Sequence, residues 1–225
     1  PILSIQAAAR VADQTTFGAS YDEIEHISNI GTEAWLEQQF SQPIGFHEPI
    51  VRRYVTEYGY DTSANPHPGF FRRFAFWEQA LAGPDPLRQL VAYSLTQVLV
   101  VSEPAQIFNN PLALSNYYDT LLEHSFGNFQ DLLLAVTLHP AMGVYLSHVN
   151  NAKTDPDANT FPDENFAREV MQLFTIGLYE LNADGSRKLD ASNVPISTYD
   201  NRTIRDFSKI FTGLSYGVAE YSPDS

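Results

Sequence analysis

The chain has 225 residues, of which 27 are acidic and 13 are basic, so its formal net charge is −14. This surplus of carboxylates repels phosphate backbones and anionic membrane surfaces, which argues against nucleic acid and acidic lipid as partners. Cysteine is absent, which excludes disulfide bonds, thiolate metal ligands and cysteine nucleophiles. No apolar run is long enough to span a membrane as a helix.

The composition is that of a folded protein. Hydrophobic residues make up 44% of the chain and aromatic residues 13%. Aromatic rings mostly fill cores, although Tyr is also common at partner surfaces. The chain begins with Pro-Ile-Leu-Ser, without an initiating Met or a signal sequence, so we expect a processed or truncated start.

Apolar residues recur at helical spacing along most of the chain. N-cap residue types mark several helix starts, namely Ser20, Thr32, Asp163 and Asp200, and Gly31 marks a helix end. The predicted helices cover residues 3–16, 20–31, 33–40, 48–58, 70–81, 87–101, 111–125, 129–139, 140–148, 163–177 and 200–212. Loops are predicted over residues 59–69, 150–162 and 182–198.

The helix predicted over residues 87–101 is the most apolar one. Asp85 followed by Pro86 is a strong start signal, because it combines an N-cap residue with a proline at the first helical position. Its apolar side chains cover almost the whole circumference of a helical wheel, which indicates a buried helix. No segment alternates with a period of two long enough to predict a strand. The predicted fold class is therefore all-α, an irregular multi-helix bundle around a buried central helix.

Five segments together resemble one bacterial family. They are AARVADQTTFG at 8–18, RQLVAYSLTQ at 88–97, HPAMGVYL at 139–146, DENFAREVMQLFTIG at 163–177 and FTGL at 211–214. The family they resemble is the bacterial domain of unknown function 1800 (DUF1800). The fourth segment is the most specific. Asp163 stands where the family usually has Asn, and Leu214 stands where it usually has Trp.

The resemblance implies an exported bacterial protein, secreted, periplasmic or at the cell surface. Family members are usually about twice as long. The 225 residues are therefore expected to be one helical domain or the N-terminal half of a larger family domain. The resemblance brings no established activity.

The predicted helix over residues 163–177 carries all its polar groups on one side. On a wheel of 100° per residue, Glu164, Arg168 and Glu169 lie on this side, and apolar residues such as Leu173 lie on the other. One interpretation is a solvated face with an i,i+4 ion pair worth only about 0.3–0.5 kcal/mol. The other is a buried polar site. In that case the candidate catalytic residues are Glu164, Arg168 and Glu169, acting in acid/base or metal chemistry.

The loop before this helix is a candidate calcium site. Its oxygens stand at alternating positions of a calcium-loop-like run, with ligand candidates Asp155, Asp157, Asn159 and Asp163. Thr160 replaces the Gly of an EF-hand loop and Phe166 replaces its final Glu, so the loop is not an EF-hand. Calcium binding and a simple turn both remain open. The run from Asn182 to Ser186 is predicted first as a tight turn.

Other sites have little support in the sequence. His139 and His148 flank a predicted short helix, and with Glu164 or Glu169 they could supply metal ligands by residue type alone. No histidine pair has the spacing of a helical metal site. Neither a Gly-x-Ser-x-Gly nucleophile elbow nor a glycine-rich phosphate loop occurs.

Two functions follow as expectations. The first is a binding or assembly component of an extracellular or cell-surface complex, whose partner is another protein or the C-terminal half of the family domain. The alternative is an exported enzyme that acts on an extracellular polymer, with a carboxylate or metal site around Glu164 and Glu169. The substrate or ligand is not indicated by the sequence.

Overall fold

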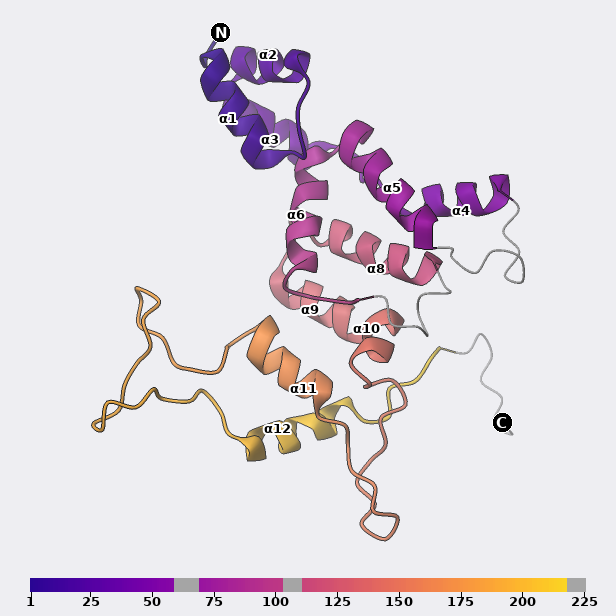
Figure 1. Cartoon of the computed structure of the whole chain (residues 1–225), viewed down its shortest axis with the longest axis vertical. Helices are drawn as coiled ribbons and strands as arrows, with labels where there is room; N and C mark the ends of the chain where they lie inside the picture. The colour runs from indigo at the N-terminus through magenta and orange to yellow at the C-terminus, as the bar shows by residue number, and fades with distance from the viewer. Residues whose placement is uncertain (59–68, 103–110, 218–225) are drawn as a thin grey trace. The chain divides into compact units, whose positions relative to one another are not determined.

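The computed structural model describes residues 1–58, 69–102 and 111–217. These residues form helices and contain no strand, apart from isolated backbone bridges, which confirms the predicted all-α class. The chain divides into two compact units, Pro1–Ala141 and Met142–Ser225. Each unit is described by itself below (Figure 1).

The first unit contains most of the helices. They are α1 (Ile5–Thr15), α2 (Tyr21–Ile30), α3 (Thr32–Ser41), α4 (Glu48–Glu57), α5 (Gly69–Ala82), α6 (Pro86–Thr96), α8 (Pro111–Glu123) and α9 (Phe129–Leu138). A short helix, α10 (Pro140–Tyr145), crosses the boundary between the units. The predicted loop over residues 59–69 lies outside the described residues except for Gly69, which begins α5.

The helix ends of α1 to α3 follow from local capping. The Ser20 hydroxyl accepts a hydrogen bond from the Glu23 N–H at 3.2 Å, as predicted for an N-cap. Gly31 ends α2 with a φ of 83° and is also the N-cap residue of α3. The prediction that Thr32 caps α3 was therefore wrong, because the glycine turns the chain at once and Thr32 is already helical.

Within the described residues of the first unit, two apolar clusters hold helices together. One joins α1, α2, α3 and the start of α6, through the buried side chains of Ala8, Ala12, Ile27, Trp35 and Leu87. The other lies between α4 and α5, where Val51 packs with Phe71 and Ala75. Tyr54 stacks on Phe71 there, with ring centroids 6.0 Å apart.

Helix α6 occupies the centre of the first unit, as predicted. It packs against α1, α3, α5 and α8. The prediction of burial all round was wrong, because Tyr93 is 42% exposed. The helix also ends at Thr96, whereas the prediction extended it to Val101. Just beyond Thr96 the Val98 N–H donates to the Leu95 carbonyl, three residues back, at 3.1 Å. The buried face of α6 is partly polar, which the count of apolar residues could not reveal.

The second unit has a small core made of rings. Its helical elements are α11 (Asn165–Glu169), the π-helical turn η1 (Val170–Phe174), α12 (Asn201–Ser208) and the 3₁₀ turn η2 (Lys209–Phe211). Helix α11 packs against α12. Phe166 is 1% exposed. It stacks on His148 at 3.9 Å and meets Phe211 edge to face at 4.8 Å.

The predicted single helix over residues 163–177 changes its winding halfway. After α11 the chain continues as η1, and the Thr175 hydroxyl donates to the Val170 carbonyl five residues back at 2.6 Å. A π-helical turn has more residues than an α-helical one, so a wheel of 100° per residue fails beyond Glu169. Leu173, which the wheel placed on the apolar side, is 58% exposed, whereas Phe174 is 5% exposed.

Between η1 and α12 the chain forms a pair of extended hairpins (Figure 1). Isolated backbone bridges join Tyr179 to Ser197, Leu181 to Arg187 and Leu189 to Pro195. The run from Asn182 is a tight turn, as predicted, with the Gly185 N–H donating to the Asn182 carbonyl at 3.0 Å. This segment was predicted as a loop, and its bridges are too isolated to make strands.

The ring core of the second unit and the π-helical turn beside it make a stability prediction. Phe166→Ala removes a buried ring and should lower the free energy of unfolding of the second unit by about 3–5 kcal/mol. Leu173→Ala, the matched control from the same segment, should change it by less than about 0.5 kcal/mol because its side chain is exposed. Urea unfolding followed by far-ultraviolet circular dichroism measures both. A large loss in the Leu173 variant would contradict the π-helical winding.

Candidate functional site

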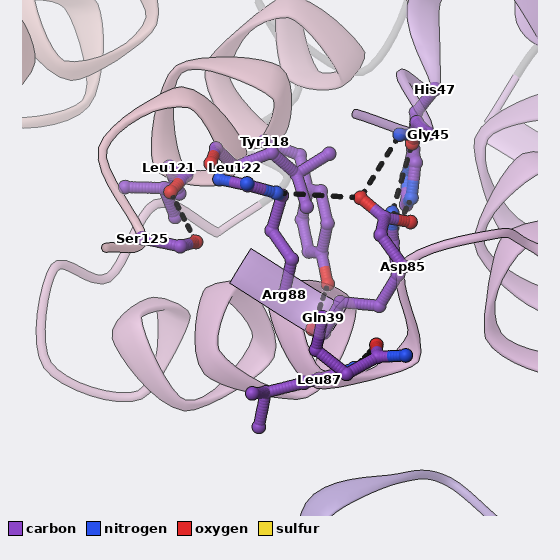
Figure 2. A network of polar contacts seen from close by, with 11 residues as sticks. Gln39, Gly45, His47, Asp85, Leu87, Arg88, Tyr118, Leu121, Leu122 and Ser125 are labelled. Atoms are coloured by element: carbon purple, nitrogen blue, oxygen red, sulfur yellow. Dashed lines mark hydrogen bonds and ion pairs between the residues drawn. The ribbon is translucent and has the colours of Figure 1, made fainter. Parts of the chain in front are cut away.

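A buried carboxylate anchors the start of α6 (Figure 2). Asp85 is 0% exposed. Its Oδ2 accepts from the Gly45 N–H at 3.0 Å and its Oδ1 accepts from Gln89 Nε2 at 3.1 Å. Asp85 is the N-cap residue of α6, as predicted, but its side chain makes no capping bond. It joins the loop before α4 to α6 instead.

Gln89 extends this contact to His47. Gln89 Nε2 donates to the Gly45 carbonyl, and Gln89 Oε1 lies 2.9 Å from His47 Nε2. An amide oxygen only accepts, so His47 Nε2 carries the proton. Burial lowers the pKa of His47 to about 4, which keeps the ring neutral near pH 7. The ring stacks on Tyr118 with centroids 4.3 Å apart.

Arg88 balances the buried charge of Asp85. Its Nε lies 3.6 Å from Asp85 Oδ2, and both side chains are almost fully buried. The guanidinium also donates to the Leu122 carbonyl at 3.2 Å and lies 4.4 Å above the Phe126 ring. Burial raises the pKa of Asp85, and the hydrogen bonds from Gly45 and Gln89 with the charge of Arg88 oppose that shift.

A second buried carboxylate fixes the start of α4. Asp119, on α8, accepts from the His47 N–H at 2.7 Å and from the Glu48 N–H at 2.9 Å. Burial raises its pKa to about 6, although these two bonds stabilise its charged form. This carboxylate and Asp85 hold α4, α6 and α8 together by polar contacts.

Next to this network lies a pocket of about 790 Å³. It is lined by residues at the end of α1, on α5, at the end of α6 and on α8. Among the described residues, six aromatic side chains contribute to its wall: Phe17, Phe76, Trp77, Tyr93, Tyr117 and Tyr118. We call it the aromatic pocket. The sequence analysis noted the aromatic excess but did not predict this pocket.

The aromatic pocket has a firm floor and an exposed rim. Phe76 contacts Phe17 at 5.5 Å and Tyr118 at 6.2 Å, both edge to face. Tyr118 is 7% exposed, whereas Trp77 is 56% exposed and Tyr93 is 42% exposed. The rings at the rim therefore offer apolar faces to solvent, while the rings below hold the shape of the pocket.

The predicted catalytic residues lie in the second unit. Arg168 and Glu164 form an ion pair at 3.0 Å, and their side chains are 40% and 34% exposed. A pair this exposed adds little stability, typically about 0–1 kcal/mol. The structure thus brings Glu164 and Arg168 together as a partly exposed i,i+4 ion pair, which agrees with the interpretation of this side of the helix as a solvated face.

Glu169 differs from its two neighbours in the motif. Its Oε2 is buried and has no hydrogen-bond partner among the described residues, and the same is true of Tyr199 Oη. Burial raises the pKa of Tyr199, while the charge of Arg168 opposes this shift and that of Glu169 adds to it. Tyr199 therefore lies near both residues. The sequence analysis missed Tyr199, whose only signal is its place directly before Asp200, the N-cap residue of α12.

The candidate calcium loop forms a tight turn. Asp155 Oδ1 accepts from the Asp157 N–H at 3.1 Å and from the Ala158 N–H at 3.2 Å. Asp155 and Thr160 also exchange backbone hydrogen bonds at 2.8 and 2.9 Å, and Asn159 has a φ of 50°. These contacts agree with the interpretation of this loop as a simple turn.

Asp163 makes its own hydrogen bonds at the start of the motif helix. Its Oδ1 accepts from the Asn165 N–H at 2.7 Å, and its own N–H donates to Asn151 Oδ1 at 2.8 Å. Within the residues that the structure describes, no three His, Asp or Glu side chains gather in a way that could hold a metal ion. Asp155, Asp157 and Asp163 do not form such a group, and calcium binding stays a prediction.

The two histidines considered as metal ligands have other contacts. His139 Nε2 lies 3.0 Å from Asn116 Oδ1, and His139 Nδ1 accepts from the Ala141 N–H at 3.1 Å. Burial lowers the pKa of His139 to about 4. His148 packs on Phe166 in the core of the second unit. Both side chains therefore take part in packing and helix capping.

The chain is thus an all-α protein with an aromatic pocket in its first unit and a polar motif helix in its second. A family model described as "Protein of unknown function (DUF1800)" matches residues 10–224, so the chain belongs to this family. No curated protein and no solved structure matches the chain. Over the part that the structure describes, the helices lack the length and apolar character needed to cross a bilayer.

The contacts that join Asp85 to Gly45, Arg88 and Gln89, and Gln89 to His47, are called the Asp85 network, and they make a second stability prediction. Asp85→Asn leaves Arg88 without its buried partner and replaces one acceptor oxygen by an amide. We expect it to lower the free energy of unfolding by about 3–5 kcal/mol. The matched control is Asp206→Asn, whose carboxylate is 56% exposed and pairs with Lys209, and it should change stability by less than about 1 kcal/mol. Urea titration measures both, and equal effects would show that the Asp85 charge is not needed.

Proposed function

We propose that this protein is an exported binding component of an extracellular or cell-surface complex. Its first unit binds an extracellular polysaccharide in the aromatic pocket. The single observation that carries the proposal is the pocket itself. Its volume of about 790 Å³ lies within the range of roughly 300–1,000 Å³ typical of ligand sites. Export is supported by the family resemblance and by the acidic surface charge, which keeps a protein soluble outside the cell.

The exposed rings at the rim support a binding role. The side chains of Trp77 and Tyr93 are each more than two-fifths exposed. Apolar ring surface in contact with water is unfavourable, and a bound ligand would cover it. The C–H faces of a sugar ring are flat and apolar, so they pack against indole and phenol rings. Each square ångström of apolar surface that the ligand covers contributes roughly 25 cal/mol.

The surrounding structure supports a preformed pocket. Phe76 and Tyr118 form its floor, and Tyr118 stacks on His47. His47 is held in turn by Gln89 and by Asp119. A pocket that is already ordered loses less conformational entropy when its ligand binds, so more of the contact energy appears as affinity.

The proposal predicts retention by polysaccharides. In native gels that contain a panel of neutral and acidic polysaccharides, the chain should be retarded by at least one of them. Trp77→Ala combined with Tyr93→Ala should weaken that binding about tenfold, because each stacked ring contributes about 0.5–1.5 kcal/mol. Tyr21→Ala is the matched control, because Tyr21 is 64% exposed on α2 and does not line the pocket.

Two results would contradict the binding function. One is unretarded migration of the folded chain in every gel. The other is equal retardation of the double variant and the wild type, which would place binding outside the aromatic pocket.

A second candidate function is an exported enzyme that acts on an extracellular polymer. The observation that favours it is the buried Glu169 Oε2, which has no hydrogen-bond partner among the described residues and lies near Tyr199. A carboxylate in this state is suited to accept or donate a proton once a substrate arrives. Glu169 also directly precedes η1, and π-helical turns often occur at functional sites.

The enzyme candidate is tested by Glu169→Gln, which keeps the shape of the side chain and removes its charge. We expect this variant to lose polymer cleavage by at least about a hundredfold, as for removal of a general acid or base, with an unchanged melting temperature. The release of reducing ends measures cleavage. Glu180→Gln, at a 43% exposed position, is the matched control and should retain full activity. Absence of cleavage by the wild type, or an unstable but active Glu169 variant, would rule out the role.

A further inference from the structure

Helix α5 presents a line of exposed apolar side chains along one side. Four large residues form it, each between 48% and 73% exposed: Phe70, Phe74, Trp77 and Leu81. They follow one another at intervals of four, three and four residues. On a wheel of 100° per residue these positions fall within about 60° of one another. We call this set of four side chains the α5 stripe.

The core contacts of α5 are made by other sides of the helix. Phe71 is 6% exposed and Ala75 is 0% exposed, and the helix packs against α4, α6 and α8. Within the stripe, the Phe74 ring meets Tyr54 edge to face at 5.7 Å, which holds it in place. The stripe is therefore an ordered apolar surface in contact with water, and such surfaces mark association sites.

The spacing of the stripe is that of a helix that packs along another helix. Intervals of four and three residues alternate between the a and d positions of a coiled-coil heptad. Phe70 and Trp77 take d positions, and Phe74 and Leu81 take a positions. A narrow seam of this kind is complementary to a second helix that carries the same seam.

The charges beside the stripe favour a second copy of α5 in parallel orientation. Arg73 takes the g position on one side of the stripe, and Glu78 takes the next e position on the other side. In a parallel pair the g position of one helix adjoins the following e position of its partner. Arg73 of each copy then adjoins Glu78 of the other. An antiparallel pair would instead bring like charges to the same side.

Both charged side chains keep the contacts that they make within one chain. The Arg73 guanidinium carbon lies 5.7 Å from the centroid of the Phe70 ring, and Glu78 pairs with Arg53 on α4. Their effect on pairing is therefore one of sign, which favours one orientation over the other. The attraction between the copies comes from the apolar stripe.

The size of the stripe sets the strength of association. Three of its members are aromatic and about half exposed, and a fully buried aromatic side chain covers about 150–250 Å². With Leu81 included, each copy therefore offers roughly 300–500 Å² of apolar surface. A stable complex buries about 800 Å² per partner, so the association is weak and reversible.

From these observations we infer that two copies of this chain associate through α5, with their stripes packed against each other as a short parallel pair of helices. The inference is independent of the proposed binding function. Trp77 belongs both to the stripe and to the rim of the aromatic pocket. The test therefore changes Phe70 and Leu81, which are not among the lining residues of the pocket.

Sedimentation velocity on the whole chain measures the association. The chain should pass from monomer to dimer as its concentration rises, with a dissociation constant on the order of 10–100 μM. Added salt should strengthen the dimer, because it screens the repulsion between two chains that each carry a net charge of −14. Association that salt weakens would overturn an apolar interface.

Phe70→Glu combined with Leu81→Glu should weaken dimer formation at least tenfold. Both side chains are more than half exposed, so the variant should keep the circular dichroism spectrum of the wild type. The matched control is Tyr21→Glu combined with Leu134→Glu. It adds the same charge on α2 and α9, at side chains that are 64% and 58% exposed, and it should dimerise like the wild type.

Introduced thiols report the orientation of the pair, because the chain has no cysteine of its own. Leu81→Cys alone should form a disulfide between two copies under mild oxidation, since equivalent a positions meet in a parallel pair. Leu134→Cys is the control and should stay monomeric. Cross-linking only in a mixture of the Phe70→Cys and Leu81→Cys variants would indicate antiparallel helices and overturn the parallel pair.

Two further results would overturn the inference as a whole. One is a chain that stays monomeric at every concentration, and the other is a Phe70 and Leu81 double variant that dimerises like the wild type. Neither result bears on polysaccharide binding, which is tested with Trp77 and Tyr93.

Discussion

The burial of the Asp85 carboxylate is the constraint on which the first unit depends. A buried charge is costly, and here the Gly45 N–H, the Gln89 amide and the Arg88 guanidinium offset that cost together. The approach at position 45 is close, because a Cβ there would come too near to Asp85 Oδ1 and Gln79 Oε1 unless those side chains moved. The loop before α4 is thereby fixed against the start of α6.

The same helix carries the polar network into the aromatic pocket. The first turns of α6 present Arg88 and Gln89 to the buried side, and its last turns present Tyr93 and Thr96 to the pocket. Gln89 reaches the pocket floor through His47, which stacks on Tyr118. A change in the network is therefore expected to alter the shape of the pocket, so that the stability of the first unit and the shape of the pocket depend on one set of contacts.

The features that could be predicted from the sequence are those set by neighbouring residues, and the features that were missed depend on contacts between distant residues. Helix ends at Ser20, Gly31 and Asp200 follow from residues within one turn, and they were predicted correctly. The Asp85 network joins residues about forty positions apart, and the pocket joins four helices, so no local pattern reveals them. The winding of η1 was missed because periodicity assumes one helix type.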